Sequence, residues 1–133
     1  MTPAWVDANV ILRYLTRDVP SLSSRARSIF AGAASGDRQL RLASLVVAEV
    51  VWTLTSFYGL ARDEVSDRVS DLVAAEGIDA QERELVLDAL RVMKERGVSF
   101  VDAYLAEKAR ASGEAVCSFD RDFDRLGVEV QRS

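Results

Sequence analysis

A short apolar run near the N-terminus passes directly into a helical pattern, and this junction constrains the fold more than any other part of the sequence. Residues 4–6 are typical of a buried strand, and apolar side chains within residues 10–15 recur at helical spacing. Asp7 stands where the strand ends. In open α/β sheets, ligands bind outside the carboxyl ends of the strands. Asp7 is therefore expected to be the first carboxylate of a site at that edge, although an Asp before a helix is also a favoured N-cap.

Short strand patterns alternate with longer helical patterns along the rest of the chain. Strands are expected at residues 40–42, 77–79, 115–118 and 128–130. Helices are expected after the capping residues Ser21 and Ser44, from Ala61 or Asp63, at residues 81–96 and at 99–111, with a helical turn at 120–126. This alternation predicts an α/β fold with a parallel sheet and helices on both faces. The length of 133 residues predicts one domain, residues 1–133.

The helix expected at residues 45–57 carries one charged side chain, Glu49, in an otherwise apolar or uncharged sequence. A helix that is apolar nearly all round is buried on more than one side. Because a domain this small can hardly enclose a whole helix, part of its surface is expected to meet another chain. A buried carboxylate needs a cation, a proton or a metal. Glu49 is therefore a candidate ligand, and a salt bridge to a distant Arg is the alternative.

Composition excludes several kinds of chemistry. The chain contains no His, which removes Ser-His-Asp and Cys-His schemes and His-ligated zinc. Its single Cys, Cys117, excludes an internal disulfide and fits a cytoplasmic location. The net charge of −4 argues against binding nucleic acid through overall charge alone. We expect no membrane span and no signal peptide.

Further acids occupy positions that suit a metal site. Asp102 follows Ser99 in a Ser-x-x-Asp pattern, which predicts a capped helix start and is compatible with ligation. Asp120 repeats the arrangement of Asp7, since a strand pattern ends in an acid and a helical turn follows. If the two strands are neighbours, Asp7 and Asp120 lie side by side. Asp122 is a further candidate ligand, although an acid in the first helical turn is also favoured without a metal.

Clustered carboxylates repel one another, and a hard cation relieves the repulsion. Mg²⁺ or Mn²⁺ suits oxygen ligands and can activate water at a phosphoryl group. Ser118 is placed to orient a carboxylate by a hydrogen bond. We expect Arg13, Arg121 and Arg125, which follow the site motifs, to guide a phosphate-bearing substrate, with ordinary surface salt bridges as the alternative.

Four segments carry a resemblance to a known family. They are Val6-Asp-Ala-Asn-Val-Ile-Leu-Arg13, Ala48-Glu-Val-Val-Trp52, Phe100-Val-Asp-Ala-Tyr-Leu105 and Ser118-Phe-Asp-Arg-Asp-Phe123. In order and spacing, the chain resembles the PIN-domain ribonucleases, and among them the VapC-type toxins of bacterial toxin–antitoxin pairs. The resemblance implies a three-layer α/β/α sandwich around a short, mainly parallel sheet of about five strands.

The resemblance also implies functional residues and partners. It assigns Asp7, Glu49, Asp102 and Asp120 as catalytic metal-binding acids, with Asp122 as an addition and Asn9 and Ser118 as polar neighbours. It implies cleavage of RNA with Mg²⁺ or Mn²⁺, a homodimer and inhibition by a cognate antitoxin. The family commonly has Thr where this chain has Ala8, so a hydroxyl contact is lost there.

Two other classes of function remain open at the level of sequence. A PIN-like module that binds RNA or protein without catalysis is the main alternative, and the complete set of four acids argues against it. A receiver-type signalling domain would have paired acids after the first strand, whereas Ala8 follows Asp7 here.

Overall fold

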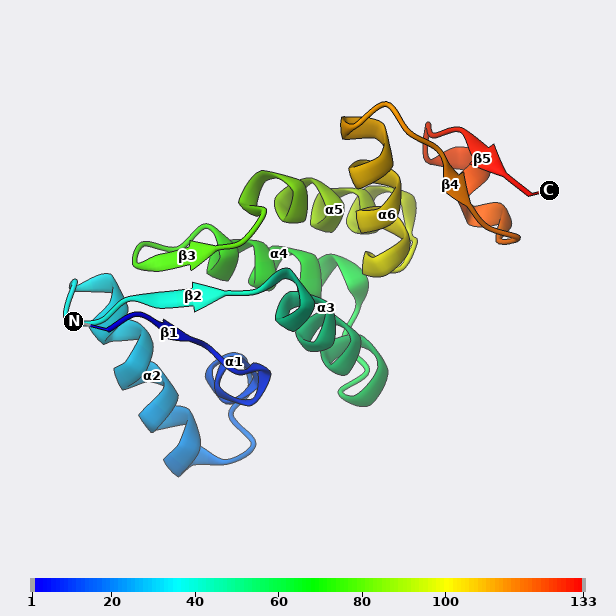
Figure 1. Ribbon diagram of the computed structural model, residues 1–133. Helices are drawn as coiled ribbons and strands as arrows, with labels where there is room; N and C mark the ends of the chain where they lie inside the picture. Colours follow the sequence, from blue (N-terminus) through cyan, green and yellow to red (C-terminus); the bar gives the residue numbers. More distant parts are fainter. Residues whose placement is uncertain (1, 133) are drawn as a thin grey trace.

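The computed structural model describes residues 2–132, in which short strands alternate with helices (Figure 1). The strands are β1 (Ala4–Trp5), β2 (Leu40–Leu42), β3 (Ile78–Ala80), β4 (Val116–Cys117) and β5 (Val130–Gln131). The α-helices are α1 (Ala8–Leu15), α2 (Pro20–Ala34), α3 (Ser44–Trp52), α4 (Arg62–Val73), α5 (Arg83–Arg96) and α6 (Phe100–Ala111). A π-helical turn, η1 (Thr53–Phe57), continues α3, and a 3-10 turn, η2 (Arg121–Arg125), follows β4.

The strands pair in parallel, as expected, but they form two sheets. One sheet has the order β1-β2-β3, with Ala4 opposite Leu40 and Leu40 opposite Ile78. The other joins β4 to β5, with Val116 opposite Val130. Figure 1 shows β4 and β5 beyond α6, away from β1. Among residues 2–132, β1 and β4 are therefore not paired neighbours.

The fold class expected from the sequence is confirmed: the chain has an α/β fold with five parallel strands, consistent with a three-layer α/β/α fold of the PIN type. The expectation of one sheet of about five strands differs from the structure, which divides them three and two.

The three-stranded sheet has alternating faces, as the two-residue period of a strand requires. Leu40, Leu42 and Ile78 are buried against the helices. Trp5 and Arg41 are exposed on the opposite side. Because each strand has only two or three residues, the strands bury little apolar surface. Most residues of the hydrophobic core lie in the helices.

Two helix starts differ from the sequence expectation. α2 begins at Pro20, with Val19 at the N-cap position, because proline's fixed φ suits the first helical position. Ser44 lies inside α3 and does not cap it; its hydroxyl donates to the carboxylate of Glu82 at 2.8 Å. Cys117 lies in β4, and its side chain is exposed.

Gly77 fixes the approach of α2 to β3. Its φ is +84°, and a Cβ built there would lie 2.1 Å from the carbonyl oxygen of Ala33. A side chain would need both a strained backbone and a displaced helix end. Glycine is therefore required where the turn before β3 meets the end of α2.

Candidate metal centre

Asp102 lies in the first turn of α6, where its backbone is already fixed by a cap. Ser99 is the N-cap residue, and its hydroxyl accepts a hydrogen bond from the Asp102 backbone N–H at 3.2 Å. The expected Ser-x-x-Asp cap is thus present, and it uses the amide of Asp102. Its carboxylate remains available for another role, and the helix N-terminus favours its negative charge.

Asp120 lies between β4 and η2 at the N-cap position, and Asp122 lies in the first turn of η2. The Ser118 hydroxyl accepts from the Asp120 backbone N–H at 2.9 Å, and Asp120 Oδ1 accepts from the Asp122 backbone N–H at 2.8 Å. Ser118 therefore orients the backbone of Asp120. Asp120 caps η2 with one carboxylate oxygen and keeps a second oxygen for a ligand.

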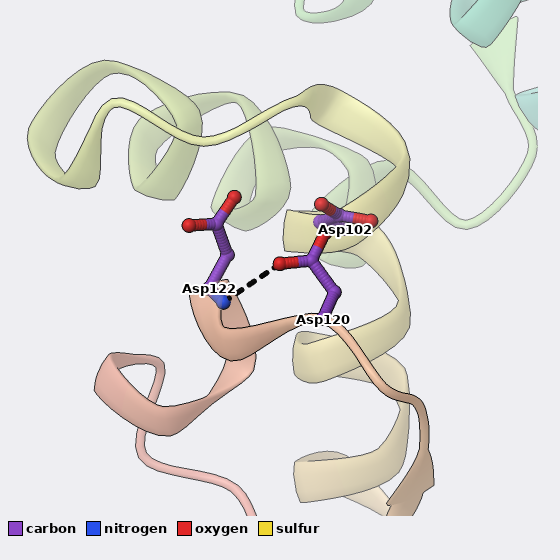
Figure 2. Close-up of side chains that lie close together, drawn as sticks. All are labelled: Asp102, Asp120 and Asp122. Atoms are coloured by element: carbon purple, nitrogen blue, oxygen red, sulfur yellow. Dashed lines mark hydrogen bonds between the residues drawn. The ribbon is translucent and has the colours of Figure 1, made fainter.

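These three aspartates form a cluster between α6 and η2 (Figure 2). One carboxylate oxygen from each lies within 4.8 Å of the corresponding oxygens of the other two. Asp102 and Asp122 are half-buried, and Asp120 is exposed. The cluster is thus an open, acidic surface site that a large substrate can reach.

The electrostatics of the cluster fit a cation. Burial raises the pKa of the Asp102 carboxyl above its ordinary value, and the negative charges of Asp120 and Asp122 raise it further. Hydrogen bonding with Ser99 and the positive charge of Arg62 act in the opposite direction on that pKa. Like charges held close together disfavour ionisation until a cation neutralises them.

The donor set suits a hard divalent ion. Mg²⁺ takes oxygen ligands at about 2.1 Å, so two ligand oxygens on one ion lie about 3–4 Å apart. The Asp102, Asp120 and Asp122 oxygens lie within 4.8 Å of one another, so small side-chain rotations would bring them to this spacing. Few protein ligands and several retained waters are the usual pattern for Mg²⁺ in enzymes that act on phosphates.

Asp7 and Glu49 lie outside this cluster, as judged over residues 2–132. Asp7 stands between β1 and α1, where it occupies the N-cap position; within the described chain its side chain makes no cap hydrogen bond. The expectation that Asp7 and Asp120 lie side by side depended on neighbouring strands, and β4 pairs with β5 instead.

Glu49 is exposed on α3, which corrects the expectation of a buried carboxylate. Val47, Val50 and Val51 cover the core from the same helix. The sequence pattern failed because α3 is apolar on both its buried and its exposed sides, so periodicity did not reveal which side faces solvent. α3 nevertheless packs against α6, the helix that carries Asp102.

The remaining candidates lie at the surface. Asn9 is exposed in the first turn of α1. Arg13 pairs with Asp18 at 3.3 Å, Arg121 with Asp124 at 3.6 Å, and Arg125 with Asp122 at 3.5 Å. The salt-bridge alternative is thus realised for all three, although exposed pairs of this kind are weak and exchange readily.

Sequence reasoning missed two arginines beside the cluster. Arg132 donates to the Asp120 carbonyl at 3.1 Å and pairs with Asp124 at 2.9 Å. Arg62 begins α4, donates to the Gly97 carbonyl and places its charge near Asp102. Neither arginine lies in one of the four segments that carry the candidate site acids, so only the folded structure shows that they lie beside the cluster.

A separate hollow of about 660 Å³ lies among α1, α2 and α4. Tyr14 and Phe30 line it together with Arg27 and Arg68, and none of the clustered aspartates does. The acidic cluster is therefore an open surface site and not part of this hollow.

The comparison with protein families decides what kind of domain carries this site. The model of the PIN domain family matches residues 4–129. The chain belongs to the PIN domain family. PIN domains are generally metal-dependent nucleases, and PIN nucleases bind RNA. No curated protein matches the chain closely enough to be reported as a relative. In residues 2–132, no helix is both long and apolar enough to cross a membrane.

Proposed function

We propose that this PIN domain is an endoribonuclease that hydrolyses RNA phosphodiester bonds with Mg²⁺ or Mn²⁺. The observation that carries the proposal is the cluster of Asp102, Asp120 and Asp122, whose oxygens lie within 4.8 Å of one another. A nuclease domain with such a cluster has the ligands needed for metal-assisted phosphoryl transfer. A bound ion would supply an activated water and would stabilise negative charge on the phosphoryl oxygens.

The chain's own residues have distinct roles in this proposal. Asp102 presents its carboxylate from a helix start fixed by Ser99. Asp120 keeps one oxygen on the Asp122 amide, which holds its carboxylate in one orientation. Because both backbones are fixed before substrate arrives, little reorganisation is needed to bind the ion and the scissile phosphate.

Asp7 and Glu49 complete the proposed set of acids in the active state. Asp7 follows β1, whose second edge has no strand beside it in the described chain, and Asp120 follows the parallel strand β4. Pairing of β4 with that edge would bring both strand ends, and their acids, to one edge of one sheet. Asn9 would then be a polar neighbour of the site, and Arg13, Arg121 and Arg125 would approach the RNA backbone.

We also propose a biological setting: the chain acts as the toxin of a toxin–antitoxin pair, in the cytoplasm, as a homodimer. Three large apolar side chains support a protein partner. Leu45, Trp52 and Phe57, which we call the α3 patch, are 82%, 67% and 78% exposed. Exposed apolar patches of this kind mark interaction surfaces. A second copy of the chain is the proposed occupant in the dimer, and an antitoxin would block the acidic site with a basic segment.

The test is cleavage of total cellular RNA by the purified chain, with fragment ends mapped with and without Mg²⁺. The proposal predicts discrete metal-dependent cuts that excess EDTA abolishes. Full cleavage in EDTA would contradict a metal-dependent reaction. RNA binding without cleavage under any divalent ion would favour the alternative, a PIN-like module that binds without catalysis.

A further inference from the structure

The hollow among α1, α2 and α4 has the size of a small-molecule site. Its volume of about 660 Å³ falls within the range of about 300–1,000 Å³ that is usual for ligand pockets. The Tyr14 ring packs on Phe30, with the ring centroids 4.4 Å apart, and 36% of Tyr14 stays exposed. Further lining side chains are apolar and buried, namely Leu15, Leu72 and Ile78. The hollow therefore offers apolar surface and an accessible aromatic ring.

Three arginines lie at one end of this hollow. Arg68 on α4 donates to the backbone carbonyl of the last residue of α1, and Arg17 follows that residue closely in the chain. The Ser23 hydroxyl of α2 lies 3.5 Å from the carbonyl oxygen of the residue before Arg17. Arg27 stands one helical turn after Ser23, on the same side of α2. Because all three arginines line the hollow, positive charge is concentrated where α1 ends.

Two of these arginines have little competition from the acids around them. α2 contains no acidic residue, so Arg27 has no partner on its own helix. Asp18, the acid next to Arg17 in the chain, already pairs with another arginine at 3.3 Å and accepts from the Tyr58 hydroxyl at 2.9 Å. A guanidinium group can donate two hydrogen bonds to one phosphate. The basic end of the hollow thus favours a ligand that carries several negative charges.

The opposite end of the hollow carries a carboxylate. Gly77 lies against the backbone of Ala33, so α2 ends close to the turn that follows α4. Glu76, an exposed residue that lines the hollow, comes directly before Gly77. Arg27 stands about 9 Å before Ala33 along α2, at 1.5 Å per residue. Because a carboxylate only accepts hydrogen bonds, this end favours a ligand group that offers N–H donors.

We propose that the hollow binds a free nucleoside diphosphate or triphosphate. Its phosphates bind the guanidinium groups at the basic end, its flat base lies against Tyr14, and Glu76 accepts hydrogen bonds from N–H groups of the base. A nucleotide joins these three chemistries in one small molecule, whereas inorganic phosphate lacks the base and an apolar ligand lacks the charge. The site is separate from the aspartate cluster, and the proposal does not depend on the RNA cleavage proposed above.

The first test measures binding of ADP and GDP to the purified chain by isothermal titration calorimetry in excess EDTA. Without a divalent ion the aspartate cluster repels phosphate, so it cannot account for binding. Loss of a charged hydrogen-bond donor typically weakens binding about 10- to 150-fold, and Arg27→Ala should do so for both nucleotides. Arg25→Ala is the matched control, because Arg25 is an exposed arginine of the same helix that does not line the hollow. It should keep the wild-type affinity.

The second test separates the base from the phosphates by comparing ADP with inorganic pyrophosphate. Tyr14→Ala should weaken ADP binding about 5- to 150-fold, the usual range for loss of base stacking, and should leave pyrophosphate binding unchanged. Ala31→Glu keeps the aromatic pair intact and adds a negative charge to the lining, so it should abolish binding of both ligands. Circular dichroism confirms that each variant is folded.

Three results would overturn the proposal. They are no measurable binding of ADP or GDP at millimolar concentration, equal ADP affinity in Arg27→Ala and Arg25→Ala, and ADP that binds no more tightly than pyrophosphate. A short RNA with a 5′-triphosphate is the competitor that distinguishes the source of the nucleotide. If it displaces ADP and binds more tightly than ATP, the hollow holds an RNA end, and the assignment to a free nucleotide is wrong.

Discussion

At the scale of single residues, the carboxylates of the acidic cluster repel one another, and a bound cation should reduce that repulsion. Asp102 is half-buried beside Asp120 and Asp122, and their negative charges help to raise its pKa. Functional sites commonly hold groups in such unfavourable surroundings at the expense of stability. The cluster should therefore be detectable by thermal unfolding, without any knowledge of the RNA.

We predict that Mn²⁺ raises the Tm of the wild type and not that of Asp102→Asn. An ion at 100 times its Kd stabilises a folded protein by about 2.7 kcal/mol, or a Tm increase of several degrees for a chain of this size. In EDTA, Asp102→Asn should be at least as stable as the wild type, because one like charge is removed. Asp88→Asn, on the exposed side of α5, is the control and should keep the full Mn²⁺ effect. Equal Mn²⁺ shifts in wild type and Asp102→Asn would argue against the site.

The residue scale also shows what the sequence could and could not predict. The cap of Ser99 on Asp102 depends on contacts within four residues and follows the sequence pattern. Ser118 was expected to bond a carboxylate, but its hydroxyl accepts from the backbone N–H of Asp120 instead. The surroundings of Glu49 depend on which side of α3 meets the core, and that is decided by residues far away in the chain.

At the scale of secondary-structure elements, Glu82 joins three helices. It precedes α5 with a left-handed backbone (φ 53°), and its carboxylate accepts hydrogen bonds from Ser44 at 2.8 Å and Tyr104 at 2.6 Å. It also pairs with Lys108 at 2.6 Å. These contacts tie the start of α3 to α6, the helix of Asp102, and they lower the pKa of Glu82 to about 2, with Lys108 the largest cause.

The lowered pKa of Glu82 predicts a pH dependence of stability. Because the folded-state pKa is below the unfolded value, the stabilisation is fully present above about pH 4.5 and is lost as pH falls toward 2. Glu82→Gln cannot form the ion pair and should lower the free energy of unfolding by about 1 kcal/mol at pH 6, after solvent screening. Urea unfolding at pH 6 and pH 2.5 measures the difference between the two proteins. It should shrink at the lower pH, and a pH-independent difference would exclude the ion pair as its source.

Element boundaries followed the sequence closely where a local signal fixed them. Gly97 ends α5 in a left-handed conformation, and α6 begins one residue after its Ser99 cap, both as the pattern predicts. Ser44, expected to cap the helix, instead lies in the first turn of α3 and donates to Glu82, 38 residues away. No local pattern contains that information.

At the scale of the whole molecule, the division of the strands into two sheets keeps Asp7, after β1, away from Asp120, after β4. The unpaired edge of β1 in the described chain is where β4 would have to pair to bring these two acids together. The number and direction of the strands could be predicted, because alternation of strand and helix dictates parallel pairing. Which strands become neighbours could not be predicted, since strand pairing depends on contacts between residues far apart in the chain. The separation of Asp7 from Asp120 is a direct consequence of that pairing.

We predict that β4 pairs with β1 in the active protein, and native Cys117 on β4 provides the test. Adjacent strands lie about 4.8 Å apart, within the Cα separation of a disulfide. Trp5→Cys should therefore form an intramolecular disulfide with Cys117 on mild oxidation in the presence of Mn²⁺, seen as altered gel mobility that reductant reverses. Asp79→Cys, on the far strand of the same sheet, should not. A fully active Trp5→Cys protein that never cross-links would refute the pairing.

The α3 patch makes a prediction about assembly. Replacing Trp52 and Phe57 by Ser removes two exposed aromatic side chains of the kind that dominate protein interfaces. The wild type should be a dimer by light scattering at micromolar concentration, and the double variant should be a monomer with an unchanged circular dichroism spectrum. A wild type that stays monomeric across a wide concentration range would contradict a homodimer formed through this patch.

In the proposed reaction, the aspartate cluster holds the ion that RNA cleavage requires. The most direct measurement is the cleavage rate of a defined RNA in Mn²⁺ for the wild type, Asp102→Asn, Asp120→Asn and the control Asp88→Asn, each confirmed to be folded. We expect a loss of at least about 100-fold for the two cluster variants, as is typical when an electrostatic catalytic group is removed, and no loss for the control. Wild-type rates in Asp102→Asn and Asp120→Asn would contradict it.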